Sequence, residues 1–83
     1  MKLGSLVRLL SEDEIVYDDA AFEWDHSLIF PTREDARDMR VTGGTSLEAG
    51  TIGTVLSFDS NFVKVCTPMG IGWSRSHYWC VVN

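Results

Sequence analysis

Residues 47–67 read Leu-Glu-Ala-Gly-Thr-Ile-Gly-Thr-Val-Leu-Ser-Phe-Asp-Ser-Asn-Phe-Val-Lys-Val-Cys-Thr, and this stretch decides the fold. Two runs in it, 51–58 and 62–67, are rich in β-branched and aromatic residues and place successive side chains on opposite faces, as strands do. The three residues between them, 59–61 (Asp-Ser-Asn), have side chains that favour turns. The stretch therefore predicts a β-hairpin.

The pattern of short strands continues on both sides of this hairpin. Residues 68–70 (Pro-Met-Gly) predict a second tight turn, and 71–74 a third strand of the same meander. Residues 74–77 are too few for an α-helix but suit a single 3₁₀ turn, and 78–82 then form a last strand. Near the other end of the chain, alternation over residues 3–10 predicts a first strand. Together these five strands predict an all-β domain.

A long excursion, residues 11–46, separates the first strand from the other four and shows no regular strand pattern. It contains many large apolar residues, so we expect it to pack against the sheet. Thr32 is a suitable N-cap for one short helix over 32–40, which Gly43 and Gly44 would end. Because 83 residues are too few for two cores, we expect a single domain, 1–83, with a long inserted loop at 11–46.

Several segments resemble small bacterial and phage SH3-like domains of unassigned function, which read G-x-x-V-R-L, then L-x-x-G-T-x-G-T-V, then V-x-V and a terminal strand. The matching segments here are Gly4–Leu9, Leu47–Val55, Val63–Val65, Gly72–Trp73 and Val81–Val82. The resemblance covers residues 3–10 and 47–82 and implies a five-stranded SH3-like barrel. In it, Gly50 and Gly53 would permit the bend or bulge at a barrel corner.

The charge of the chain is unevenly placed. The net charge is −5, and seven of the twelve acidic residues lie between positions 12 and 25. Acidic surfaces repel phosphate backbones, which disfavours nucleic-acid binding and favours a basic protein partner. No apolar run reaches the roughly 18 residues needed to span a bilayer, and no signal-peptide pattern opens the sequence, so we expect a cytoplasmic protein.

The residues that carry catalysis or bind metals form no convincing constellation. Cys66, Cys80, His26 and His77 lack the paired spacing of a zinc site, so we expect neither a metal nor a cofactor. Each histidine directly follows an acid or a serine, and such adjacency rarely aligns a base with a nucleophile. We therefore expect no enzyme activity. The cysteines suit two small buried thiols, with a disulfide between neighbouring strands as the alternative.

Aromatic residues give the remaining functional signal. Strand alternation places Tyr78 and Trp79 on opposite faces, so one of them is expected to face outward, unless the excursion 11–46 covers it. Exposed Trp and Tyr often anchor interfaces. The leading hypothesis is a protein-interaction module, such as a small phage-type inhibitor or adaptor, that docks a basic surface through an acidic, aromatic face. That face would consist of Tyr17, Asp18, Asp19, Trp24, Trp73 and Tyr78.

Two other functions stay open. One is a nucleic-acid-binding barrel of the transcription-factor type, although Glu48 stands beside the glycines where that function favours Lys or Arg. The other is self-association, with residues 1–10 as an open edge strand that pairs across a two-fold axis.

Overall fold

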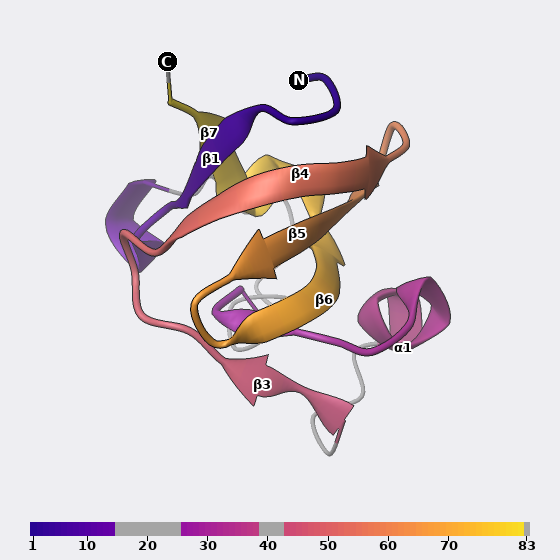
Figure 1. Cartoon of the computed structure of the whole chain (residues 1–83). Coiled ribbons are helices and arrows are strands. Elements are labelled where there is room, and N and C mark those ends of the chain that lie inside the picture. Colours follow the sequence, from indigo (N-terminus) through magenta and orange to yellow (C-terminus); the bar gives the residue numbers. More distant parts are fainter. Residues whose placement is uncertain (15–25, 39–42, 83) are drawn as a thin grey trace.

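Five antiparallel strands form the main sheet of this protein in a computed structural model that describes residues 1–14, 26–38 and 43–82 (Figure 1). The strands are β1 (Leu6–Leu9), β4 (Ile52–Phe58), β5 (Phe62–Thr67), β6 (Gly70–Arg75) and β7 (Trp79–Val81). Their order in the sheet is β6-β5-β4-β1-β7. The predicted meander 51–74 thus forms three consecutive neighbours, and the last strand lies on the far side of the first. The protein is mostly β.

β1 lies inside the sheet and not at its edge. Val7 on β1 is opposite Gly53 on β4 and opposite Val81 on β7. The expectation that residues 1–10 form an open edge is therefore wrong, because both sides of this strand are already paired. Within the described ranges, strand pairing does not run on from β6 to β7, so the sheet is not closed by backbone hydrogen bonds.

The sheet bends where β4 carries one extra residue. Val55 is opposite Val65, whereas Ser57 is opposite Lys64, so Leu56 is the additional residue of a bulge. The sequence resemblance implied a bend or bulge at Gly50 and Gly53, whereas the structure has the bulge further along β4, at Leu56. Gly53 serves another need, because a side-chain Cβ there would lie 3.2 Å from the carbonyl oxygen of Cys66.

The excursion between β1 and β4 contains short strands that its sequence pattern did not predict. β2 (Leu28–Ile29) and β3 (Thr45–Ser46) form a two-stranded sheet. The next residue, Phe30, joins β6 through two backbone hydrogen bonds with Trp73, of 2.9 and 2.7 Å. These contacts confirm that the described parts of the excursion pack against the main sheet.

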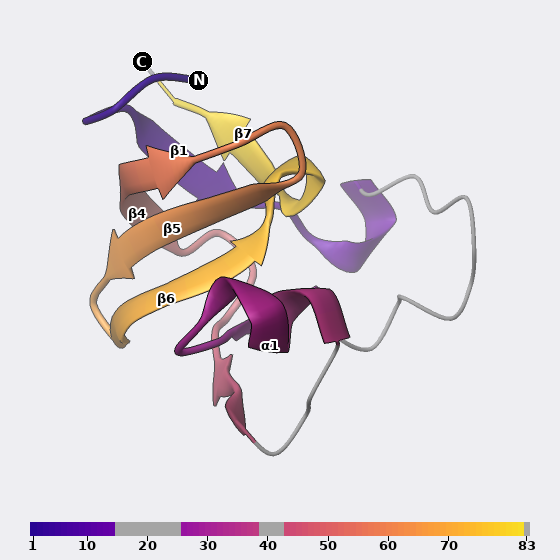
Figure 2. The same cartoon turned by 90° about the vertical axis from the view of Figure 1, so that its right-hand side faces the viewer.

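The helical elements are short. They are η1 (Glu12–Glu14), α1 (Arg33–Asp38) and η4 (Ser76–Tyr78). The backbone amide of Asp35 donates to the hydroxyl of Thr32 over 3.1 Å, which confirms the predicted N-cap of α1. Figure 2 shows α1 beside β6, with which it makes most of its contacts. In the described ranges, no helix combines the length and the apolar character that crossing a bilayer would need.

Two hydrophobic clusters stabilise this arrangement. The main core lies on one side of the sheet, and a smaller cluster lies beneath α1. The main core contains Val7, Leu9, Ile29, Leu47, Val55, Val63, Val65, Tyr78 and Trp79. The smaller cluster contains Phe30, Ala36 and Phe62, with Leu28 and Trp73 packed against it.

The prediction that either Tyr78 or Trp79 faces outward is wrong. Tyr78 is 0% exposed and Trp79 is 6% exposed. The prediction assumed that both residues belong to one strand, where neighbouring side chains alternate between faces. Tyr78 instead ends the 3₁₀ turn η4, and only Trp79 begins β7. The change of backbone conformation between them turns both rings into the core.

Candidate binding groove

The two described residues of the acidic, aromatic face predicted from the sequence, Trp73 and Tyr78, do not lie together in the structure. Tyr78 lies in the main core, and Trp73 is half-buried in the cluster beneath α1. The two rings therefore belong to different clusters and present no common surface. The other four residues of the predicted face, Tyr17, Asp18, Asp19 and Trp24, lie outside the described residues.

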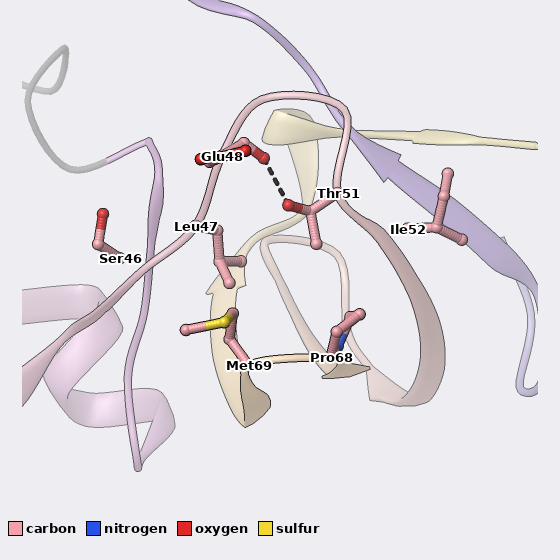
Figure 3. A pocket seen from close by; sticks show the side chains of 7 residues that line it. All are labelled: Ser46, Leu47, Glu48, Thr51, Ile52, Pro68 and Met69. Atoms are coloured by element: carbon pink, nitrogen blue, oxygen red, sulfur yellow. Dashed lines mark hydrogen bonds between the residues drawn. The ribbon is translucent and has the colours of Figure 1, made fainter.

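A groove lies elsewhere, between the connection from β3 to β4 and the turn from β5 to β6 (Figure 3). Its cavity volume is about 590 Å³, which falls in the range of roughly 300–1,000 Å³ typical of binding pockets. In Figure 3 the side chains of Leu47 and Met69 point toward each other from its two walls. The lining residues are Ser46, Leu47, Glu48, Thr51, Ile52, Pro68 and Met69.

Backbone hydrogen bonds hold the β3–β4 wall to β1. The amide of Gly50 donates to the carbonyl of Leu9 over 2.8 Å, and the amide of Leu9 donates to the carbonyl of Thr51 over 2.9 Å. A tight turn closes from Glu48 to Thr51, with Gly50 at a φ of +88° that suits only glycine. This wall is therefore positioned by the sheet itself.

The opposite wall is a turn fixed by a threonine. The Thr67 hydroxyl donates to the carbonyl of Gly70 over 2.8 Å and accepts from the amide of Met69 over 3.2 Å. These bonds hold the turn backbone while the Met69 side chain stays 63% exposed. Hairpin turns usually carry Gly, Asn, Asp or Ser, and an exposed thioether beside a groove is typical of an adaptable contact surface.

The chemistry of the groove is apolar with one acid. Leu47 belongs to the core as well as to the lining, while Ile52, Pro68 and Met69 supply exposed apolar surface. Glu48 is the acidic residue of the lining, and its side chain is exposed. Among the described residues, the lining includes no cation, histidine or thiol. The groove can therefore hold an apolar group beside a positive charge, and its described lining has no nucleophile activated by a base.

The two cysteines are exposed and free, which contradicts the expectation of buried thiols. Cys66 is opposite Thr54, and Cys80 is opposite Arg8, both on the solvent side of the sheet. Two strands, β4 and β1, separate their strands, and three strand spacings amount to roughly 14 Å. That distance exceeds the reach of a disulfide.

The groups that could bind a metal stay apart in the parts of the chain that the structure describes. No three His, Cys, Asp or Glu side chains gather there in a way that would hold an ion. His77 lies against the ring of Tyr78, with 4.3 Å between the ring centroids. Its position is at the 3₁₀ turn and not in the groove lining.

Two carboxylates, those of Glu14 and Asp59, have lowered pKa values because of contacts that hold loops to the rest of the fold. Hydrogen bonds from Arg8 and Ser11 lower the pKa of Glu14 to about 2. The backbone amides of Asn61 and Phe62, and then the Arg33 side chain, lower the pKa of Asp59. Both carboxylates lie outside the groove and accept hydrogen bonds within the protein, so their shifts indicate structural roles.

Comparison with protein-family models, with curated proteins and with solved structures finds no match to this chain. The groove therefore has to be interpreted from its own residues. Sequence reasoning missed it because residues 46–52 and 67–70 approach each other only through strand pairing. One signal was present: Pro68 and Met69 put two apolar side chains on a tight turn.

Proposed function

We propose that this chain is a non-enzymatic protein-binding module with an SH3-like barrel architecture, and that its groove binds a basic segment of a partner protein. The bound segment would place an apolar side chain against Leu47 and Met69 and a Lys or Arg beside Glu48. The observation that carries this proposal is an apolar groove whose described lining residues include one carboxylate and no cation. Such a protein acts by occupying a partner's surface, as an inhibitor or adaptor does.

The arrangement of strands supports the SH3-like part of the proposal. A first strand, a long connection to the next strand of the sheet, a three-stranded meander, a 3₁₀ turn and a short last strand follow one another here. This is the order that the sequence resemblance implies. In small barrels the loops and turns at the ends of the strands are free to form binding sites, and the groove lies between two such segments.

The charge of the chain supports a basic partner. A net charge of −5 steers cations toward the protein, and Glu48 then offers a carboxylate at the groove itself. Lys and Arg suit this site because their aliphatic stems can lie on apolar surface while their charged ends reach a carboxylate. A basic segment with one neighbouring aliphatic residue fits both parts of the groove.

Nuclear magnetic resonance can test the groove with synthetic peptides. The probe is a short peptide of alternating Lys and Leu, and the matched peptide has Glu in place of Lys. We expect the Lys peptide to shift amide signals of residues 47–52 and 67–70, and the Glu peptide to leave them unchanged. Glu48→Lys should weaken binding about three- to tenfold, and Met69→Ala should also weaken it.

The matched control is Glu34→Lys, which makes the same change of charge on α1, away from the groove. It should reduce binding less than Glu48→Lys does. Raising the salt concentration should weaken the interaction, since part of it is electrostatic. The proposal is wrong if the Lys peptide shifts no groove signal, or if Glu34→Lys and Glu48→Lys weaken binding equally.

A further inference from the structure

The main sheet carries none of the acidic residues of this acidic protein. Within its five strands, the charged residues are Arg8, Lys64 and Arg75, all of them basic. The twelve Asp and Glu residues all lie outside these strands. Charge is thus segregated, with the acids in the connections and short helices.

The solvent side of the sheet is also largely apolar. Strand register aligns Leu6, Thr54, Cys66 and Ile71 in one row across β1, β4, β5 and β6. Leu6 is 48% exposed and Ile71 is 56% exposed. The neighbouring row adds Ile52 and Cys80, on either side of Arg8. We call these residues the sheet face: Leu6, Ile52, Thr54, Cys66, Ile71 and Cys80.

No described helix covers this surface. In Figure 1, β4 and β5 face the viewer and no other element is drawn in front of them. α1 lies to one side, beside β6. The apolar residues of the row are much more exposed than the core residues behind them. Contiguous exposed apolar surface on a small protein typically marks an interface.

We propose that the sheet face binds the same face of a second copy of this chain, forming a two-fold dimer. Two chains of net charge −5 repel each other wherever their acidic segments meet. The sheet face is a surface on which that repulsion is weakest, because no strand residue is acidic. Arg8 already forms an ion pair with Glu14, and Arg75 donates to the Arg37 carbonyl at α1. The third strand cation, Lys64, lies on the same side of β5 as Cys66, so the charge that the face presents to its copy is small and positive.

Charge also argues against other partners on this surface. A basic protein would meet no carboxylate of the strands here. An acidic partner would find Arg8 engaged by Glu14, and of the strand residues on this side it would have Lys64 to pair with. A copy of the same face supplies an apolar surface that is equally free of strand carboxylates. In a two-fold dimer each contact between two residues occurs twice, once from each copy. Leu6 and Ile71 of both copies would therefore lie in the interface.

The dimer contact and the proposed groove are separable. Ile52 belongs to both surfaces, whereas Leu6 and Ile71 belong to the sheet face alone and Met69 to the groove alone. The variant Leu6→Lys/Ile71→Lys should therefore abolish the dimer and keep binding of the Lys and Leu peptide. Met69→Lys should impair peptide binding and keep the dimer.

Sedimentation equilibrium in reducing buffer, from about 10 μM to 1 mM protein, tests the dimer directly. We expect the apparent mass to rise from the 9.3 kDa of one chain toward twice that value. Added salt should leave the dimer unchanged or strengthen it, because salt screens the repulsion between two acidic chains. The double lysine variant should remain monomeric. If that variant does not fold, Leu6→Thr/Ile71→Thr gives the same test with residues that favour strands.

Alkylation of Cys66 by a maleimide gives an independent readout, since this thiol lies between Thr54 and Ile71 in the row. We expect its reaction to slow as the protein concentration rises through the dimerisation range, and not to slow in the lysine variant. A wild-type protein that stays monomeric up to about 1 mM would overturn the proposal. A dimer that survives the lysine variant and leaves Cys66 fully reactive would overturn it as well.

Discussion

The guanidinium of Arg8 on β1 donates two parallel hydrogen bonds to the carboxylate of Glu14 in η1, of 3.1 and 3.0 Å. The backbone amide and the hydroxyl of Ser11 donate to the same carboxylate, each over 3.0 Å. The two bonds from Arg8 thus anchor η1 to the sheet where the long excursion begins, and the two from Ser11 hold the carboxylate in place at the start of η1. Although the ion pair is exposed, its bidentate geometry gives it a defined orientation.

This contact should make stability depend on pH. The pKa of Glu14 is about 2, below its ordinary value of 4.5. The unfolded chain therefore takes up the proton first, and the stabilisation is complete above about pH 4.5 and is lost as the pH falls toward 2. Glu14→Gln should be less stable than the wild type at pH 7, and the difference should shrink across that window in urea unfolding. Asp13→Asn, an exposed acid of the same turn, is the control. An unchanged difference at pH 2 would contradict the assignment.

Gly72 on β6 leaves no room for a side chain. A Cβ there would lie 2.8 Å from the Cβ of Ile29 and 3.0 Å from the carbonyl oxygen of Phe30. We expect Gly72→Ala to destabilise the protein by about 1–3 kcal/mol, because the contact of β6 with Ile29 of β2 and with Phe30 must open. Gly43→Ala, whose Cβ would meet its nearest neighbour at 3.8 Å, should change stability by less than about 0.5 kcal/mol. Equal effects of the two substitutions in thermal unfolding would disprove this packing.

Tyr78 should behave as a core residue and not as a docking residue. Its side chain is fully buried in the main cluster. Tyr78→Ala should cost about 3–5 kcal/mol, comparable to the whole stability of many small domains. His77→Ala, at the exposed neighbour, should cost much less. Circular dichroism and urea unfolding would measure both, and a folded Tyr78→Ala protein of nearly normal stability would show that the ring is not in the core.

Both thiols should react in the native state. Cys66 and Cys80 are exposed, so Ellman's reagent should titrate two thiols per chain without denaturant, at protein concentrations too low for self-association. The denatured protein should give the same number. Cys66→Ser and Cys80→Ser should each remove one equivalent. A native chain that releases no thiol signal until it is denatured would contradict the exposure seen here.

The local patterns of the sequence predicted most of the sheet. The strand predicted at 62–67 has the same bounds as β5, and the strand at 51–58 differs from β4 by one residue. Alternation assigned Val7 and Leu9 to one face, and both are buried. These features depend on near neighbours in sequence: turn residues, strand period and a helix cap at Thr32.

The remaining features depend on contacts between distant segments. β2 and β3 have two residues each and carry no period to detect, and they pair with each other beside the bridge from Phe30 to Trp73. The groove exists because the segment after β3 is hydrogen-bonded to Leu9, next to the turn after β5. The predicted aromatic face relied on a strand alternation that the 3₁₀ turn at Tyr78 interrupts. Strand pairing between distant segments, and the change from a 3₁₀ turn to a strand after Tyr78, cannot be inferred from the residues of one short segment.

The interior position of β1 has a consequence for how this chain reaches its native state. The three strands of the meander meet across tight turns and can assemble early, whereas Val7 must find Gly53 and Val81, both far away in sequence. On a ribosome, the partner strand β7 is made long after β1. β1 must therefore wait, with its apolar side chains unprotected, until Trp79–Val81 has been synthesised, and chaperones can bind it during that interval.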